Sequence, residues 1–115
     1  MSLYIKTLRP WQWTKNLILF IPYLLFNKSI EDDFIFLIAV FLNFSLFVSS
    51  TYIFNDIKDR NIDKYHKLKS LRPIASEKIS LKNAKIYGTS LFISNLLVSY
   101  ILNPNLTILF LIYAS

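Results

Sequence analysis

The chain has 115 residues, 54% of them hydrophobic and only 17% charged, with a mean hydropathy of +0.42 and a formal net charge of +6. Soluble domains are about a quarter charged, so this composition lacks the polar surface of a small globule, and it also excludes a disordered tail or a disulfide scaffold. With no cysteine and one histidine, cysteine-based zinc, iron–sulfur and thiol chemistry are excluded as well.

Formal charge is confined to three separate segments. Residues 1–15 carry a net charge of +3 and residues 28–33 a net charge of −2, whereas residues 56–85 carry nine Lys or Arg against four Asp or Glu, a net of +5. Long uncharged stretches separate these segments, which is typical of a multi-span membrane protein and not of a basic nucleic-acid-binding face. We therefore expect no nucleic acid partner and an all-α fold, a multi-span transmembrane helical bundle.

The first predicted span, about residues 12–27, is short and contains Pro22. A basic start followed by an apolar stretch is also typical of a signal peptide, but no cleavage site of the A-x-A type follows. If this span begins near Trp11, Lys15 lies within the helix, where it must face a water-filled cavity or extend to the membrane interface. We predict a real but short span here.

The second predicted span, residues 34–55, contains no charge over its whole length. A helix of this length reaches about 33 Å, enough for a hydrocarbon core of about 30 Å. A third span is predicted at 86–102, and the sequence Asn103-Pro104-Asn105 then predicts a turn. The apolar run 106–115 is too short to cross a bilayer, so we expect a partial fourth span and a missing C-terminal half of the bundle.

The asymmetry of Lys and Arg predicts the orientation in the membrane. Positively charged segments stay on the cytoplasmic side, so the N-terminus and the loop 56–85 are predicted to be cytoplasmic. The short segments around 27–33 and 103–105 are then outside. We expect an integral protein of a bacterial cytoplasmic (inner) membrane, with residues 1–115 forming the N-terminal part of one transmembrane domain.

Polar side chains at the end of the second span and just after it occur at helical spacing. If the helix continues past the membrane surface, the rotation of about 100° per residue places five of them on one stripe. The stripe consists of Tyr52, Asn55, Asp56, Asp59 and Asp63. Carboxylates on one face repel one another unless a cation neutralises them, and oxygen ligands without His or Cys suit Mg²⁺. The alternative is a solvated helix end whose acids are balanced by neighbouring Lys and Arg side chains.

A dense group of cations lies further along the same loop. Lys69 and its neighbours could bind the phosphates that a metal does not cover, although a cytoplasmic loop requires Lys and Arg in any case. Arg72 is the stronger candidate, because it immediately precedes the rigid Pro73 and its forked guanidinium can bind phosphate through two hydrogen bonds. His66 is interpreted as a loop residue and not as a general base.

Two separated motifs resemble a known family. The pattern Asn55-Asp56-x-x-Asp59-x-x-x-Asp63, followed by Arg72-Pro73-Ile74-Ala75-Ser76, resembles the first aspartate-rich motif of the UbiA superfamily of intramembrane prenyltransferases. The segment Leu8-Arg9-Pro10-Trp11-Gln12-Trp13-Thr14-Lys15-Asn16-Leu17 is similar to the branch that contains decaprenyl-phosphate phosphoribosyltransferases, as is Ser49-Ser50-Thr51-Tyr52-Ile53-Phe54.

The resemblance implies a site that binds a diphosphate through Mg²⁺. In the family the metal is held by two aspartate-rich motifs, of which the second would lie beyond Ser115. The expected catalytic residues are Asp56, Asp59 and Asp63, and the expected metal ligands are these three with Asn55. The expected substrate-binding residues are Lys15, Asn16, Tyr52, Asn55, Lys69 and Arg72. For Lys15 and Asn16, a position at the membrane interface without substrate contact is the equal alternative.

The resemblance also implies a reaction. A phosphoribosyl group would pass from soluble phosphoribosyl diphosphate to a polyprenyl phosphate lipid, or, alternatively, a prenyl chain would pass from a prenyl diphosphate to an aromatic ring. In both cases a diphosphate leaves a carbon that becomes cation-like, and Mg²⁺ and cationic side chains stabilise the leaving group. An inactive fragment or a non-enzymatic membrane module is the alternative of another class, and the 115 residues alone are expected to be inactive.

The chain departs from that branch at two positions. Ser70 stands where the branch usually has Arg, and Glu77 stands where it usually has Gly. Both positions flank Arg72, so they leave open whether the donor is phosphoribosyl diphosphate or a prenyl diphosphate.

Overall fold

The structure is a computed structural model that describes residues 2–20 and 30–115. Every regular element in these ranges is a helix. In chain order the elements are α1 (Leu3–Leu8), the 3₁₀ helix η1 (Pro10–Phe20), α3 (Ile30–Asp63), the 3₁₀ helix η2 (Lys69–Leu71), α4 (Leu81–Leu102) and α5 (Pro104–Ala114). The prediction of an all-helical fold is confirmed for the described residues.

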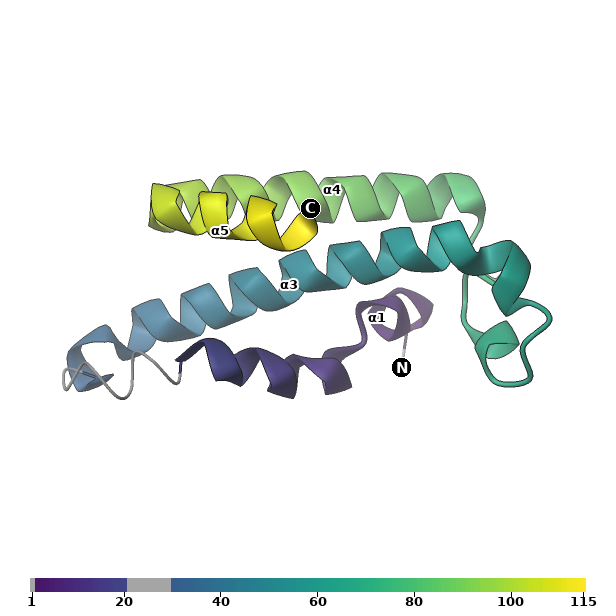
Figure 1. Ribbon diagram of the computed structural model, residues 1–115, viewed down its shortest axis with the longest axis horizontal. Coiled ribbons are helices and arrows are strands. Elements are labelled where there is room, and N and C mark those ends of the chain that lie inside the picture. Colours follow the sequence, from purple (N-terminus) through teal and green to yellow (C-terminus); the bar gives the residue numbers. More distant parts are fainter. Residues whose placement is uncertain (1, 21–29) are drawn as a thin grey trace.

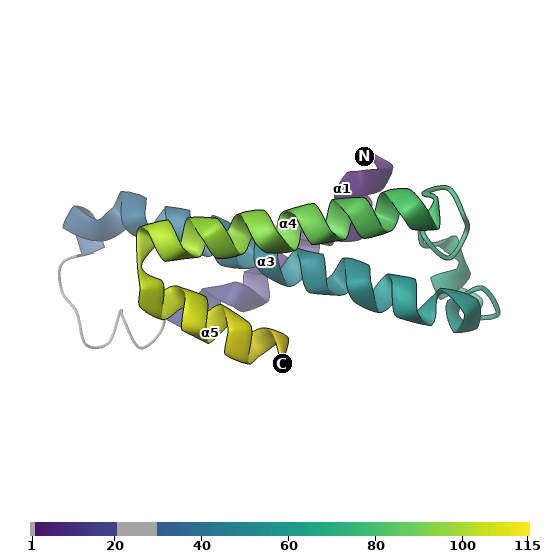
Figure 2. The same cartoon turned by 90° about the horizontal axis from the view of Figure 1, so that it is seen from above.

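The helices pack side by side around the long helix α3. Helix α4 runs antiparallel along α3, and α5 folds back beside them (Figures 1 and 2). Helix α1 and η1 lie against a different side of α3, away from α4 in the view of Figure 1. The molecule measures 49 × 25 × 25 Å along its principal axes. Because α3 contacts every other helix named here, it sets the positions of the segments that form the site.

Within the described residues, two helices are long and apolar enough to cross a membrane, Phe34–Asp63 and Leu81–Leu102. They contain the predicted spans 34–55 and 86–102 and extend beyond them. Helix α3 continues for two further turns to Asp63 and α4 begins at Leu81, so residues 64–80 connect the two helices.

The two outer predicted spans differ in how far the structure describes them. The run 106–115 lies almost wholly in α5, which is shorter than a membrane-crossing helix. For the first span, 12–27, the structure shows a 3₁₀ helix up to Phe20, and the remaining residues of that prediction lie outside the described residues.

Two N-terminal caps explain where α4 and α5 begin. The Ser80 side chain accepts a hydrogen bond from the backbone N–H of Asn83 at 3.2 Å. Asn103 does the same for Asn105 at 3.0 Å, and Pro104 occupies the first turn, where its missing N–H costs nothing. The predicted turn at 103–105 is therefore the cap that allows α5 to reverse direction.

The hydrophobic core is divided into two clusters along α3. The first joins Phe44, Phe47 and Val48 of α3 to Phe110 of α5. The second lies at the other end, where Ile53 packs with Ile74 and Ile79 of the loop and with Ala84 of α4. This second cluster fixes the loop and α1 against α3, because Leu3 and Leu8 also pack on it.

Close approach of α3 and α4 depends on one glycine and one amide pair. A Cβ atom on Gly88 of α4 would lie only 3.0 Å from Cγ2 of Ile53. Further along, the Asn43 side-chain amide donates to the backbone carbonyl of Asn95 at 2.9 Å and to its side-chain oxygen at 3.1 Å. Small residues and polar pairs of this kind hold helices together where the surroundings are apolar.

Two hydrogen bonds attach helix η1 to α3, and the bonded residues are one turn apart on each helix. A 3₁₀ helix has three residues per turn, so Trp13 and Asn16 share one face. Trp13 Nε1 donates to Ser49 Oγ at 2.9 Å, and Asn16 Nδ2 donates to Ser45 Oγ at 3.0 Å. The two serines are four residues apart, one α-helical turn. This pairing fixes the register of the N-terminal segment along α3.

Candidate functional site

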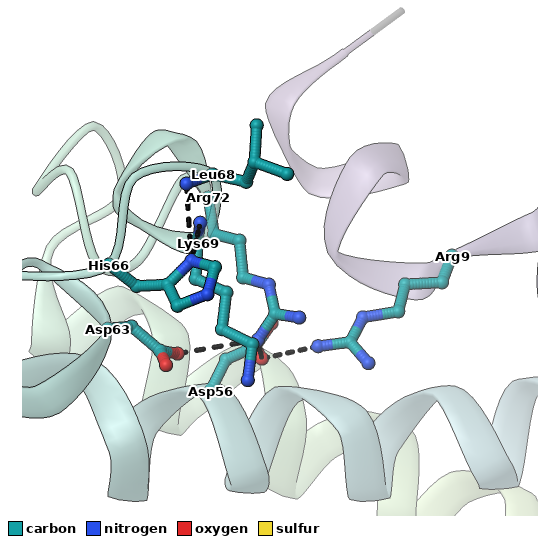
Figure 3. A network of polar contacts seen from close by, with 7 residues as sticks. All are labelled: Arg9, Asp56, Asp63, His66, Leu68, Lys69 and Arg72. Carbon is teal, nitrogen blue, oxygen red and sulfur yellow. Dashed lines mark hydrogen bonds and ion pairs between the residues drawn. The ribbon is translucent and has the colours of Figure 1, made fainter.

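The aspartates at the end of α3 are joined to two arginines from distant segments. Arg9, which follows α1, donates from Nη2 to Oδ1 of Asp56 at 2.5 Å. Arg72, from the loop between α3 and α4, donates from Nη1 to the same oxygen at 3.3 Å and to Oδ2 of Asp63 at 3.3 Å. Figure 3 shows the two guanidinium groups approaching Asp56 from different segments. We call Arg9, Asp56, Asp63 and Arg72 the ion-pair cluster.

The cluster is largely shielded from solvent. The side chains of Asp56 and Asp63 are 5% and 4% exposed, whereas Arg9 and Arg72 are 18% and 33% exposed. A buried carboxylate is stable only when it is paired and hydrogen-bonded. Two positive and two negative groups meet this condition, and the arginines form its more accessible side.

The position of Arg9 follows from the end of α1. Arg9 caps this helix with a left-handed backbone conformation (φ 52°), which turns the chain sharply before Pro10. The preceding carbonyl, that of Leu8, accepts a hydrogen bond from Ser49 Oγ at 2.6 Å. The Arg9 guanidinium also lies 4.8 Å from the centre of the Tyr52 ring, a cation–π contact. Three contacts therefore hold Arg9 against α3.

The position of Arg72 follows from the folding of the loop. His66 Nδ1 accepts hydrogen bonds from the backbone N–H groups of Leu68 and Lys69, at the start of η2 (Figure 3). On the other side of Arg72, the carbonyl of Pro73 accepts from the backbone N–H of Ile79 at 3.1 Å. The interpretation of His66 as a loop residue agrees with this role, because its ring organises the turn.

The departure at Glu77 has a structural consequence. Glu77 has a left-handed backbone conformation with a φ of 64°. Glycine adopts this conformation without steric cost, whereas a residue with a Cβ atom pays about 1–2 kcal/mol. Glu77 therefore has a strained backbone conformation. It stands where the branch that the chain resembles usually has Gly.

A cavity of about 270 Å³ lies beside the ion-pair cluster. One wall is formed by α1 and the start of η1, and the other by the loop that carries Arg72. The lining residues are Lys6, Thr7, Arg9, Trp11, Asp56, Leu68, Leu71, Arg72 and Pro73. The cavity thus combines three cationic side chains with one carboxylate and several apolar groups.

The residues of the predicted stripe differ in their exposure to solvent. Asp56 and Asp63 are buried in the cluster, Asp59 is half-buried, and Asn55 is exposed. Asp59 forms no ion pair with another residue in the described part of the chain. Tyr52 contacts Arg9 through its ring. The structure therefore joins Asp56, Asp63 and Tyr52 through arginines, and leaves Asp59 and Asn55 beside them.

Three other predicted substrate-binding residues do not line the cavity. Lys15 is exposed and donates to Gln12 Oε1 at 2.8 Å. Asn16 is buried, with its side-chain nitrogen bound to Ser45. Lys69 is exposed, and its backbone N–H donates to His66. Their assignment as substrate contacts remains a prediction.

Arg9 was not among the sequence candidates for the site. Its ion pair with Asp56 joins residues that are far apart in the sequence, so no local pattern predicts it. One signal was nevertheless present, because Arg9-Pro10 repeats the Arg72-Pro73 dipeptide that made Arg72 a candidate. Both Arg-Pro pairs meet at the same carboxylate.

The same residues bear on the predicted metal site. Within residues 2–20 and 30–115, no group of three or more His, Asp or Glu side chains is close enough to share a metal ion. Nη1 of Arg72, however, lies 3.3 Å from an oxygen of Asp56 and 3.3 Å from an oxygen of Asp63. A single positive centre therefore contacts both carboxylates, and their oxygens have the chemistry that a hard divalent cation requires.

Comparison with known proteins identifies sequence relatives of the chain. The sequence pattern described as "UbiA prenyltransferase family" matches residues 16–115. Over 114 residues the chain is 31% identical to the decaprenyl-phosphate phosphoribosyltransferase of Mycobacterium tuberculosis (strain H37Rv) and 35% identical to that of Mycolicibacterium smegmatis. Over 83 residues it is 42% identical to the uncharacterized protein y4nM of Sinorhizobium fredii.

These relatives are much longer than the chain. The two phosphoribosyltransferase alignments cover 95% of this chain but only 38% and 36% of the relatives, and the third covers 70% of this chain and 16% of its relative. The chain thus spans less than two fifths of the length of each. No solved structure matches the chain significantly.

Proposed function

The chain belongs to the UbiA prenyltransferase family, and on this basis we propose that it forms the diphosphate-binding end of a membrane transferase. The single observation that carries the proposal is the ion-pair cluster, in which Arg72 contacts both Asp56 and Asp63 at 3.3 Å. Two carboxylates and two guanidinium groups at one helix end can bind a cation and phosphate oxygens together.

We propose that Asp56, Asp59 and Asp63 hold Mg²⁺ directly or through water molecules, with Asn55 as a neutral ligand or an orienting group. When bound, Mg²⁺ would neutralise negative charge on the leaving diphosphate. Arg9 and Arg72 would hold phosphate oxygens, because a guanidinium presents five N–H donors and each arginine uses only one nitrogen in the cluster.

The proposed reaction is the transfer of a phosphoribosyl group to a polyprenyl phosphate. The bond between the anomeric carbon and the diphosphate oxygen breaks, and the diphosphate leaves with the electron pair. An oxygen of the lipid phosphate then forms the new bond to that carbon. The names of the two phosphoribosyltransferase relatives support this choice. Transfer of a prenyl chain to an aromatic ring is the second candidate, supported by the description of the family.

The apolar helices α3 and α4 support a location within the membrane. We propose that the N-terminus and the loop carrying Arg72 face the cytoplasm, where a soluble donor is available. Lys15, Asn16 and Lys69 are proposed as further substrate contacts on the same side.

A donor assay tests the proposal. Membranes that contain the complete protein are supplied with Mg²⁺, polyprenyl phosphate and phosphoribosyl diphosphate labelled in its ribose, and the labelled lipid is quantified. A parallel reaction contains labelled prenyl diphosphate and an aromatic acceptor. Labelled polyprenyl phosphoribose supports the proposed reaction, and a prenylated aromatic product alone supports the second candidate. No transfer from either donor contradicts both.

A further inference from the structure

We propose that the side of α4 facing away from α3 binds one anionic phospholipid of the cytoplasmic leaflet, selected by two lysines at the start of the helix. The ligand class is a phosphodiester lipid with a net negative head group, such as phosphatidylglycerol. It is a structural ligand and not a substrate. The inference rests on the proposed orientation in the membrane, and its site shares no residue with the proposed diphosphate site.

The side of α4 that faces away from α3 has no other described helix against it. The residues of α4 that are buried against α3 and α5 are Ala84, Gly88, Asn95 and Ser99. On the opposite side, an open groove of about 560 Å³ runs along the helix from Lys85 to Leu97. Figure 1 shows this side of α4 at the top of the molecule, uncovered.

The groups along this groove follow the order of the groups in a phospholipid. Lys85 lies at one end, Thr89 lies about 6 Å further along the helix axis, and Leu97 lies about 18 Å from Lys85. One leaflet of the hydrocarbon core is about 15 Å thick, and its head-group region adds about 6 Å. With Lys85 at the level of the phosphate, the hydroxyl of Thr89 lies at the level of the ester groups, and the apolar end of the groove lies beside the acyl chains.

The two lysines carry charge that the protein does not neutralise locally. Lys82 and Lys85 are both exposed, and their spacing of three residues places them on one face of α4. Neither forms an ion pair with a residue that the structure describes, and the sequences of α4 and α5 contain no Asp or Glu. Lysines at the cytoplasmic surface attract anionic lipids, whereas a zwitterionic head group brings a positive charge of its own.

Two hydroxyl groups below the lysines add hydrogen-bond donors. Thr89 and Ser90 are exposed, and neither hydroxyl bonds to another described residue, whereas Ser94 donates to the carbonyl of Leu91 at 3.2 Å. A hydroxyl without a partner in apolar surroundings costs free energy, and the ester carbonyls of a phospholipid supply acceptors at this depth. A further helix of the same protein is the alternative occupant, and it would need acidic groups opposite the lysines.

Photo-crosslinking in the complete protein tests the inference. Ile93, which lines the groove, is replaced by p-benzoylphenylalanine, which reacts on illumination with a C–H bond that touches it. The protein is placed in phosphatidylcholine nanodiscs with increasing fractions of radiolabelled phosphatidylglycerol, without donor and without Mg²⁺. We expect a labelled lipid adduct that saturates as this fraction rises. Radiolabelled phosphatidylethanolamine at the same fractions should give about tenfold less adduct.

Matched variants test the two lysines and the hydroxyl. Lys82→Gln and Lys85→Gln each remove one cation of the face, so each should raise the half-saturating fraction of phosphatidylglycerol about fivefold. Lys67→Gln removes the same charge from the loop and should leave this fraction unchanged. Thr89→Val keeps the shape of the side chain but removes its hydroxyl, and should raise the fraction about threefold.

Three results would overturn the inference. Equal labelling by phosphatidylethanolamine would indicate an unselective contact with lipid. An adduct with another segment of the protein in place of lipid would show that protein covers this side of α4. An unchanged half-saturating fraction in both lysine variants would show that the lysines do not select the head group.

Failure of this inference is distinguishable from failure of the proposed function. If the adduct does not depend on the lysines while the donor assay shows transfer, the inference fails and the function stands. If the adduct forms as expected but neither donor supports transfer, the function fails and the phospholipid site stands, because the crosslinking reaction contains neither donor nor Mg²⁺.

Discussion

Arg9 and Arg72 donate to the same oxygen, Oδ1 of Asp56, at distances of 2.5 and 3.3 Å (Figure 3). One arginine follows α1 and the other belongs to the loop before α4, and each immediately precedes a proline. A single carboxylate on α3 thus joins the N-terminal segment to the loop. Because Asp56 is almost fully buried, this junction contributes to stability as well as to the site.

Loss of Arg9 should destabilise the protein. Arg9→Gln leaves the buried carboxylate of Asp56 with Arg72 as its remaining partner, and the loss of a hydrogen bond to a charged group costs about 1.5–3 kcal/mol. We expect this decrease in the free energy of unfolding, measured by denaturant titration in detergent micelles. Arg9→Lys should lower the free energy of unfolding by less than Arg9→Gln does, because lysine keeps the positive charge although it lacks the forked guanidinium.

The matched control for this prediction is a double-mutant cycle. Asp56→Asn removes the buried charge that Arg9 neutralises, so Arg9→Gln should cost much less in the Asp56→Asn background than in the wild type. Additive effects of the two substitutions would show that the residues are not coupled and would refute the ion pair.

Replacement of Glu77 by glycine should stabilise the loop. The left-handed backbone at Glu77 costs about 1–2 kcal/mol for a residue with a Cβ atom, partly offset by the greater freedom of glycine in the unfolded chain. Glu77→Gly should therefore raise the free energy of unfolding by about 1 kcal/mol or less. Glu77→Ala removes the same charge but keeps the Cβ atom, so it should give no such gain. Equal stabilisation by both would assign the effect to charge.

The predicted orientation in the membrane is testable without background labelling, since the chain has no cysteine. Lys67 and Asn105 are both exposed; Lys67 lies in the loop that precedes α4, and Asn105 lies in the first turn of α5, which follows the other end of α4. In intact cells, Asn105→Cys should react with a membrane-impermeant maleimide, whereas Lys67→Cys should react only after the membrane is opened. The reverse pattern would contradict a cytoplasmic loop.

Much of the fold could be predicted because the relevant signals are local. The uncharged run 34–55 and the Asn103-Pro104 turn correspond to α3 and to the reversal before α5. The position at which α3 ends could not be predicted, because the polar residues 56–63 could be read either as loop or as continuing helix. In the structure this stretch stays helical, and its buried faces pack against the loop and α1.

The candidate site could be predicted only in part. Helical spacing gave the stripe of carboxylates, but it could not show that Asp56 and Asp63 are buried while Asn55 is exposed. That difference depends on which side of α3 is covered by Arg9 and Arg72, and their approach depends on tertiary contacts such as the Ser49–Leu8 hydrogen bond. Spacing within one helix contains no information about such contacts.

The carboxylates of α3 are proposed to act with Mg²⁺ on a diphosphate. The most direct measurement is the release of diphosphate from phosphoribosyl diphosphate by membranes that contain the complete protein and polyprenyl phosphate. We expect release that stops when Mg²⁺ is chelated and that falls about 100-fold in Asp56→Asn and in Asp63→Asn. Glu77→Gln, which neutralises an exposed carboxylate of the loop, should keep the wild-type rate. Wild-type release by both aspartate variants, or release that persists after chelation, would contradict the claim.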